Sequence, residues 1–353
     1  MASSSGSTGH FRRTREQSPR VLETAPQAAP SPKIELHVHL EGTVRPGTLL
    51  EIAKRNDYAL PAETEEGLAP LFEFRDFRHF IDIWMLTTGA LKHEEDFRQI
   101  VVEYAAEAVS HGAVYIEAIF APMLRRGVDC DVMFEGYCNG AQEARELHGV
   151  EVRLTPDIPR GYTDEECDTT VRAAVKYRER GIVGLGLGGL EADFPPELYA
   201  RPFAQARAEG LASVPHAGEV AGPESVRGAL EALKADRIRH GVRSVEDPGL
   251  LEEIVDRRIV LDVCPISNVR TRVVRSLEEH PLPQLVAAGA LCSISTDDPA
   301  MFGTDLSRDY EAAAELGLQP RQAFEAGLEG ALCGEATKTR LKGVGDSFDW
   351  QIP

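Results

Sequence analysis

The sequence lacks long apolar segments and clustered cysteines. No apolar run approaches the roughly 18 residues that a membrane helix needs, and no lipidation motif is visible. The six cysteines are scattered along the chain without CxxC spacing, so neither a disulfide framework nor a Cys-based zinc site is indicated. Scattered cysteines are typical of reduced thiols in cytoplasmic proteins. We therefore expect a soluble cytoplasmic protein without a membrane partner.

Positive charge is also scarce. Lysine and arginine number 38 against 57 aspartates and glutamates, which gives a formal net charge of −19. A surface this acidic repels phosphate backbones, which argues against a nucleic-acid partner. The 42% of hydrophobic and 27% of charged residues are ordinary for a globular protein. A chain of 353 residues is long enough for one large α/β barrel or two medium domains.

The first part of the chain differs in character from the rest. Residues 1–32 are rich in serine, proline and alanine, and they lack both hydrophobic periodicity and an apolar signal region. They predict a disordered leader rather than a secretory signal. From Lys33 onward, short β-branched or apolar runs alternate with amphipathic stretches of helical length.

This alternation predicts an α/β protein. The expected strands are 33–38, 112–120, 150–156, 183–188, 211–216, 236–240, 259–263 and 291–296. The expected helices are 94–110, 131–147, 163–180, 197–209, 223–234 and 247–257, and residues 46–56 and 77–91 predict a helical excursion after the first strand. The repetition favours a (β/α)8 barrel of the TIM type over a doubly wound sheet, which is the alternative. We expect one barrel domain over 33–342 and a C-terminal tail over 343–353.

The glycine-rich segment 184–189 resembles a dinucleotide-binding fingerprint. Its context differs, because the glycines lie inside an expected strand in the middle of the chain. Glycines in a strand more often allow another group to approach the backbone closely. We therefore expect a close neighbour here and no dinucleotide.

Histidines and aspartates fall where expected strands end. His37 and His39 alternate in the first strand, so their side chains share one face. His216 and His240 end the fifth and sixth strands, and Asp297 follows the eighth together with Asp298. The carboxyl ends of barrel strands meet at one rim, so these groups are expected to lie together.

Neutral imidazoles and a carboxylate suit Zn²⁺, which supplies hydroxide at neutral pH. A second metal would need a bridging group, and residues 155–160 contain no lysine. We therefore expect one Zn²⁺. The other histidines, expected to be solvated on helices or loops, are His10, His79, His93, His111, His148 and His280.

Four motifs occur in the order HVHLEG, HAGE, RHG and STDDP. Together they resemble the adenosine deaminase family of the amidohydrolase superfamily, and the resemblance extends over residues 33–342. It implies a zinc-dependent hydrolase that removes the 6-amino group of an adenine-containing small molecule. By this resemblance the zinc ligands are His37, His39, His216 and Asp297. The HxE and PCxxC signature of the cytidine-type zinc deaminases is absent.

The same resemblance implies roles for the other motif residues. His240 would orient the attacking water and take its proton, and Glu219 would donate a proton to purine N1. Asp298 would contact N7, and the backbone N–H of Gly189 would contact N3. A rim salt bridge is the alternative for Glu219, and a turn before Pro299 is the alternative for Asp298. Asp305 is expected to cap a helix.

The substrate prediction depends on two positions. Adenosine deaminases usually carry Asp after HVHL, whereas Glu41 here resembles adenine deaminases. Gly189 resembles the nucleoside enzymes, since adenine deaminases tend to carry Ser there. The combination favours a nucleoside with an altered 5′ end, and we expect 6-amino-6-deoxyfutalosine, an intermediate of menaquinone biosynthesis that carries a keto-linked benzoate. Adenosine is the next candidate, and the alternatives are an adenine deaminase or a catalytically weak purine-binding relative.

A benzoate subsite would need an apolar wall and a cation. The excursion offers Phe74, Arg75, Phe77, Phe80 and Trp84, and Arg45 is a second cation near the rim. Ordinary helix packing is the preferred interpretation of the aromatic residues, with the subsite as the alternative. The expected partner is a small purine nucleoside, and the sequence leaves a homo-oligomer open.

Overall fold

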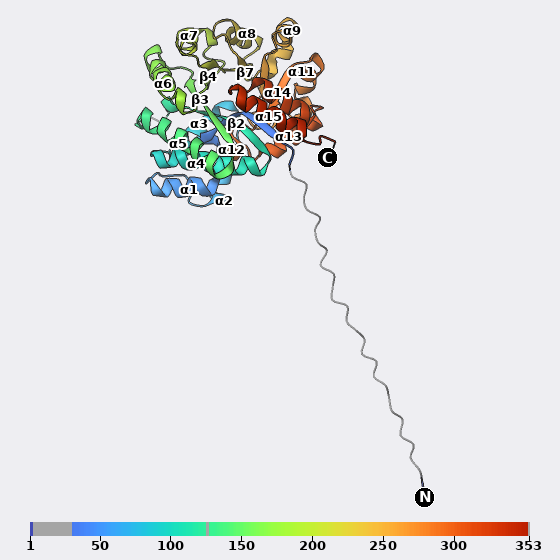
Figure 1. Cartoon of the computed structure of the whole chain (residues 1–353). Coiled ribbons are helices and arrows are strands. Elements are labelled where there is room, and N and C mark those ends of the chain that lie inside the picture. The colour runs from blue at the N-terminus through green and yellow to red at the C-terminus, as the bar shows by residue number, and fades with distance from the viewer. Residues whose placement is uncertain (3–29, 125–126, 352–353) are drawn as a thin grey trace.

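Short parallel strands alternate with helices in the computed structural model, which describes residues 1–2, 30–124 and 127–351 (Figure 1). The strands are β1 Lys33–His39, β2 Ala113–Phe120, β3 Glu151–Pro159, β4 Gly184–Gly188, β5 Ala212–Ser213, β6 His216–Ala217, β7 Arg237–His240, β8 Val260–Val263 and β9 Leu291–Ile294. Nearly all of the expected leader, 1–32, lies outside the described residues.

The strands form a closed barrel. Strands β1 to β5 pair in order, as do β6 to β9, and all these pairs are parallel. The first and last strands meet where Val38 bridges Asp297, and the backbone N–H of His39 donates to the carbonyl of Asp297 over 2.7 Å. The prediction of a (β/α)8 barrel is confirmed, and a doubly wound sheet is excluded.

The fifth barrel strand is interrupted, so the expected strand 211–216 is divided into β5 and β6. Val214 still pairs with the preceding strand through its N–H and the carbonyl of Leu185. Pro215 has no N–H, and its carbonyl accepts instead from Arg239 in β7. The two halves therefore occupy one barrel position.

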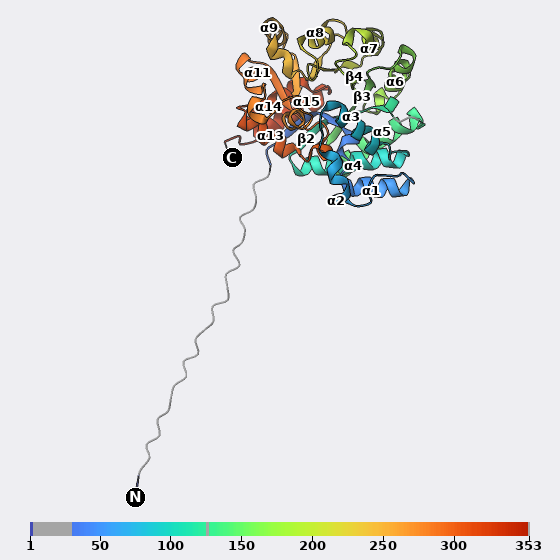
Figure 2. The ribbon, with the colours of Figure 1, turned by 180° about the vertical axis from the view of Figure 1, so that it is seen from behind.

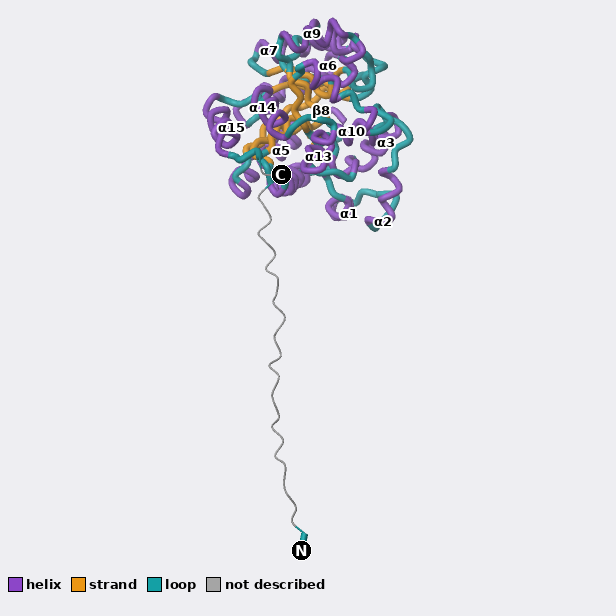
Figure 3. Tube along the Cα trace, turned by 90° about the vertical axis from the view of Figure 1, so that its right-hand side faces the viewer, coloured by secondary structure: helices purple, strands orange, loops and turns teal. Residues whose placement is uncertain are grey.

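Helices surround the strands, as Figures 2 and 3 show. They are α1 Pro46–Arg55, α2 Glu65–Leu68, α3 Phe77–Thr88, α4 Glu94–Ser110, α5 Cys130–His148, α6 Asp164–Lys176, α7 Ala200–Ala208, α8 Pro223–Glu231, α9 Pro248–Asp256, α10 Pro265–Arg270, α11 Leu282–Ala288, α12 Pro299–Phe302, α13 Leu306–Glu315, α14 Pro320–Gly330 and α15 Glu335–Ser347. None of the described helices is long and apolar enough to cross a membrane.

Several helices fit the expectations and others extend them. The predicted excursion corresponds to α1 and α3, and Asp305 caps α13 by accepting from the N–H of Arg308 over 3.0 Å. Helices α10 to α15 have no counterpart among the expected helices. Helix α15 runs across residue 342, where a tail was expected to begin, and Trp350 packs against Phe324.

The barrel interior holds buried ion pairs beneath the rim. Arg239 in β7 donates to Asp157 in β3 over 2.5 Å, and both side chains are buried. The glycines of β4 make room for this pair, because a Cβ at Gly186 would overlap both the carboxylate of Asp157 and the guanidinium of Arg239. The close neighbour expected from the glycine-rich segment is thus an ion pair.

Gly186→Ala should lower the free energy of unfolding by about 3–5 kcal/mol, because the new methyl group displaces a buried, paired charge. Urea unfolding of the variant and the parent measures this difference. The matched control is Gly343→Ala in α15, where nothing lies within 4 Å of the added Cβ. Alanine favours a helix interior, so the control should be unchanged or slightly stabilised. Equal stability of Gly186→Ala and the parent would contradict the role assigned to this glycine.

Candidate active site

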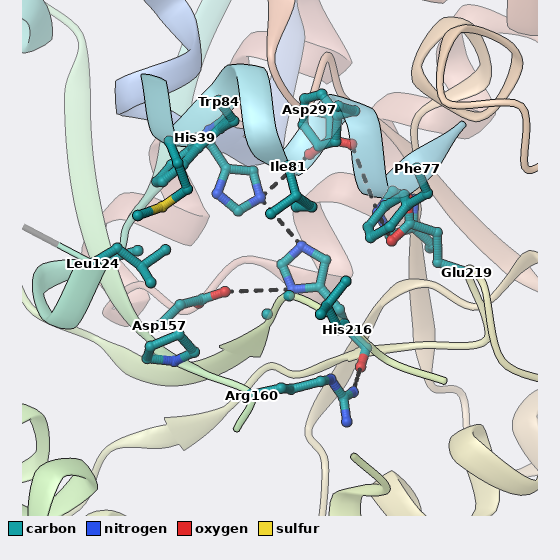
Figure 4. Close-up of a pocket in the computed structure, with 18 residues that line it drawn as sticks. His39, Phe77, Ile81, Trp84, Leu124, Asp157, Arg160, His216, Glu219 and Asp297 are labelled. Carbon is teal, nitrogen blue, oxygen red and sulfur yellow. Dashed lines mark hydrogen bonds and ion pairs between the residues drawn. The ribbon is translucent and has the colours of Figure 1, made fainter. Parts of the chain in front are cut away.

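Five side chains from distant parts of the sequence converge at one rim of the barrel. His37 and His39 come from β1, His216 from β6 and His240 from β7, and Asp297 follows β9. Figure 4 shows His39, His216 and Asp297 directed toward one another. The expectation that the strand ends bring these groups together therefore agrees with the geometry.

Four of the donor atoms form a tight set. The Nε2 atoms of His37 and His39 lie 3.1 and 3.2 Å from Nε2 of His216. They lie 3.1 and 3.3 Å from Oδ1 of Asp297. Four atoms that bind Zn²⁺ at about 2.0–2.1 Å in a tetrahedron are about 3.3 Å apart, so the spacing fits one such ion. His240 stands beside this set, with its Nε2 3.7 Å from Oδ2 of Asp297.

The environment prepares these groups to bind a cation. Burial lowers the pKa of His37 and His216 well below the usual range, and it lowers the pKa of His39 to about 4. The imidazoles are therefore neutral near pH 7 and can offer a lone pair. Nδ1 of His216 donates to the carbonyl of Leu187 over 2.9 Å, which leaves Nε2 as the donor atom for an ion.

Two of these residues have a strained backbone conformation. His240 and Asp297 have φ angles of 64° and 66°, in the left-handed region that side chains other than glycine rarely adopt. Such conformations cost on the order of 1–3 kcal/mol each and persist where the surrounding structure imposes them. Ser267 helps to hold the side chain of Asp297 in this position, because its hydroxyl donates to Oδ2 of Asp297 over 2.6 Å.

A cavity of about 250 Å³ opens beside the donor atoms. Helix α3 supplies one wall through aromatic and aliphatic side chains, and the segment after β4 supplies part of another. The residues that line it are His39, Phe77, Phe80, Ile81, Trp84, Met85, Ala121, Leu124, Asp157, Pro159, Arg160, Gly188, Gly189, Leu190, His216, Glu219, His240 and Asp297. The lining is largely apolar with a few polar groups, which is typical of a small-molecule site.

Glu219 faces this cavity from a loop that Glu191 holds in place. The carboxylate of Glu191 accepts from the backbone N–H of Gly218 over 2.6 Å, and also from those of Glu219, Val220 and Ala221. Glu219 itself is only 5% exposed, which does not fit a rim salt bridge. Burial, and then the nearby carboxylates of Asp297 and Glu191, raise the pKa of Glu219 well above its usual range. Glu219 therefore keeps its proton to a higher pH than an ordinary glutamate does.

A family model described as adenosine deaminase matches residues 32–343. The chain belongs to the adenosine deaminase family. The deaminase is 50% identical over 328 residues to the aminodeoxyfutalosine deaminase of Acidothermus cellulolyticus, covering 90% of this chain and 92% of that one. It is 38% identical over 312 residues to the adenine deaminase of Cupriavidus necator, covering 86% and 89% of the two chains.

Solved structures agree with this assignment. An adenine deaminase from Arthrobacter aurescens superposes with a TM-score of 0.85 and 29% identity, covering 90% of this chain and 98% of that one. An amidohydrolase from Burkholderia ambifaria with bound zinc superposes with a TM-score of 0.82 and 26% identity, covering 92% and 94%. The protein is therefore a hydrolytic deaminase, and its His and Asp cluster can hold a metal ion.

The structure brings Gly189, Phe77 and Trp84 into the cavity wall, together with Phe80. These aromatic side chains also pack with Phe74 in one cluster. They therefore both pack the helix and line the cavity, which were the two interpretations that the sequence left open. Trp84 has a further polar contact, because its indole N–H donates to Oδ1 of Asp298 over 2.9 Å. Helix α3 thus supplies part of the cavity wall of the deaminase.

Four other residues that the sequence singled out do not line this cavity, and their roles toward a substrate stay predictions. Arg75 is exposed and does not line the cavity. Arg45 pairs with Glu107 and donates to the carbonyl of Thr304, so it serves the rim of the barrel. Glu41 is buried outside the cavity wall, and its carboxylate accepts from the N–H of Ala121 over 2.9 Å. Asp298 is buried next to Trp84 and is also not part of the cavity lining.

Several residues of the deaminase site were missed from the sequence. Arg160 follows β3 and donates from Nη2 to the carbonyl of His216 over 2.7 Å. His280, expected to be solvated, is instead buried and hydrogen-bonded to Asn268. Asn268 and Ser267 come soon after β8 ends, and this strand-end position could have identified them. Glu191 lies three residues after β4 ends and has the same strand-end position, whereas His280 lies in a loop and gave no such signal.

Proposed function

We propose that the protein removes the 6-amino group of 6-amino-6-deoxyfutalosine. The observation that carries this proposal is the 50% identity with an aminodeoxyfutalosine deaminase over 90% of the chain. The apolar cavity beside a buried, protonated glutamate supports the same reaction. By this proposal the enzyme belongs to menaquinone biosynthesis and acts in the cytoplasm.

His37, His39, His216 and Asp297 would hold one Zn²⁺, as their spacing and their neutral imidazoles favour. An ion bound there supplies a hydroxide nucleophile near neutral pH. The chain's own groups then act on the purine ring. Glu219 donates its proton to N1, which makes C6 more electrophilic and accounts for the need to keep this carboxyl group protonated.

Two further contacts orient the purine ring. Gly189, whose φ of 96° suits glycine, lines the cavity and donates its backbone N–H to N3. Burial, together with the nearby Asp297 carboxylate, raises the pKa of Asp298 well above its usual range. A protonated Asp298 can donate to N7, which is an acceptor only. The Trp84 N–H holds its other oxygen.

The direction of the 5′ substituent follows from this orientation. In a purine, N9 is attached to the ring carbon opposite N1, so the ribose points away from Glu219. Leu124 lies on the opposite side of the cavity from Glu219 (Figure 4). Leu124 and Met85 also line a second hollow of about 510 Å³ that contains Lys92. By this proposal the benzoate lies in this second hollow.

Lys92 replaces Arg75 as the proposed cation for the benzoate. Its ammonium group donates to the carbonyl of Asn56 over 2.8 Å and lies 5.5 Å from the ring centre of Tyr58. An ammonium group has three N–H donors, so one contact to a carbonyl leaves capacity for a carboxylate.

Lys92→Gln should lower kcat/KM for aminodeoxyfutalosine about tenfold through a higher KM, because a charge-assisted hydrogen bond is worth roughly 1.5–3 kcal/mol. The kcat/KM for adenosine should stay within about twofold, since adenosine has no carboxylate. Arg75→Gln is the matched control and should leave both substrates unaffected. Equal losses on both substrates would show that Lys92 acts on the fold and not on the benzoate.

A comparison of kcat/KM for aminodeoxyfutalosine, adenosine and adenine tests the proposed substrate. We expect aminodeoxyfutalosine to be preferred by at least tenfold. Faster turnover of adenosine would overturn the proposal in favour of the nucleoside enzyme. Faster turnover of adenine would favour the second candidate, adenine deaminase, which the 38% identical relative and Glu41 support.

A further inference from the structure

A chain of three buried hydrogen bonds leads from the start of helix α11 to the active-site histidine. The backbone N–H of Leu282 donates to Nδ1 of His280 over 3.1 Å. Nε2 of His280 lies 3.1 Å from Oδ1 of Asn268, and Nδ2 of Asn268 lies 3.2 Å from Nδ1 of His240. The three side chains are at most 3% exposed, so solvent does not compete for these contacts.

The first donor fixes the direction of every later bond. A backbone N–H can only donate, so Nδ1 of His280 must be the unprotonated nitrogen. Its Nε2 therefore carries the hydrogen and donates to the side-chain oxygen of Asn268. The Asn268 amide group is thereby oriented with its NH₂ toward His240. Nδ1 of His240 must then accept, which leaves the hydrogen of the neutral ring on Nε2.

We infer that Asn268 and His280 are positioning residues that fix His240 as the Nε2–H tautomer, so that His240 donates a hydrogen bond into the site and does not act as a base. This inference rests on the proposed function for its catalytic consequence only. Nε2 of His240 lies 3.6 Å from Oε2 of Glu219 and 3.7 Å from Oδ2 of Asp297, so its hydrogen faces the reacting groups. A base at Nε2 would need hydrogen on Nδ1, directed at the NH₂ of Asn268.

The inference changes where protons travel. Water replaces the amine at C6, one of its two protons ends on N1, and the other leaves with ammonia. Glu219 gives a proton to N1 and, as a carboxylate, can accept the proton that the water loses and return it to the amine. His240 then stays neutral throughout, and the reaction balances without a protonated histidine.

Nitrogen-15 NMR of the zinc-loaded enzyme labelled on histidine tests the tautomers directly, because two-bond couplings distinguish Nδ1–H from Nε2–H. We expect Nε2–H for both His240 and His280 at pH 7. Loss of the corresponding signals in His240→Gln and His280→Gln assigns them. Nδ1–H or a doubly protonated ring at His240 would overturn the inference. The spectrum needs no substrate, so its result does not depend on whether the proposed function is correct.

Asn268→Asp provides the second test, since it keeps the shape but presents only acceptors to His240. We expect His240 to gain hydrogen on Nδ1 and kcat to fall at least tenfold, measured on whichever purine proves to be the best substrate, with the zinc content unchanged. His148→Gln at the end of α5 is the control and should retain kcat within about twofold. An unchanged tautomer together with unchanged kcat in Asn268→Asp would overturn the inference.

Discussion

Glu219→Gln should keep its metal and lose between about 10² and 10⁴ in kcat, the usual contribution of a general acid. The glutamine side chain has nearly the same shape and can donate a hydrogen bond to N1, but it cannot transfer a proton. Glu219 is not part of the tight donor set, so the zinc content should not change. Steady-state kinetics and metal analysis on the same preparation measure both quantities.

Glu224→Gln is a matched control for this substitution. Glu224 is exposed near the start of α8, five residues further along the chain, and accepts from the N–H of Gly222. It should retain full activity. Normal turnover by Glu219→Gln would remove Glu219 as the acid. Since the raised pKa of Glu219 keeps its acid form present well above the usual carboxyl range, parent activity should fall only as the pH rises through that raised value.

His216→Ala should lose the metal and, with it, at least about 10³ in kcat. Its Nε2 is within 3.2 Å of the Nε2 atoms of both β1 histidines, so its removal opens one corner of the donor set. Binding of an ion to the native state alone stabilises that state. The parent should therefore lower its Tm on treatment with a chelator, whereas the variant should not respond.

Zinc stoichiometry and thermal unfolding with and without chelator measure these outcomes. His148→Ala, which changes a histidine far from the donor set, should behave as the parent. Full metal occupancy in His216→Ala would show that this histidine is not a ligand. The chelator response separates loss of the ion from a general loss of folding, because an unfolded variant would show no transition at all.

The features that could be predicted from the sequence are those that depend on local order. Alternating strand and helix patterns predicted the barrel. The strand-end positions of His37, His39, His216 and Asp297 predicted that these residues lie together. Barrel topology alone converts a strand-end position in the sequence into a rim position in space. The division of the fifth strand at Pro215 was missed because the prediction made 211–216 one strand although its proline has no N–H to pair with the preceding strand.

The features that were missed depend on contacts between distant segments. Glu191 contacts the loop 218–221 about 30 residues away, and no local pattern marks such a partner. Arg75 and Lys92 flank α3, but only tertiary packing decides which cation lies near a hollow that borders the cavity. His280 could not be distinguished from a solvated histidine, because its burial depends on the tertiary contact that the loop before α11 makes with Asn268 after β8.

The seam that closes the barrel has a consequence for partially folded chains. His37 and His39 of β1 and Asp297 after β9 make the backbone hydrogen bonds of this seam, and their side chains form part of the proposed ion site. The first and last strands are about 260 residues apart in the sequence, so this contact pairs the two ends of the barrel. In a chain that has not closed the seam, the carboxylate of Asp297 therefore does not face the imidazoles of His37 and His39. Incompletely folded molecules should be inert rather than weakly active, and activity per molecule should report the fraction of closed barrels.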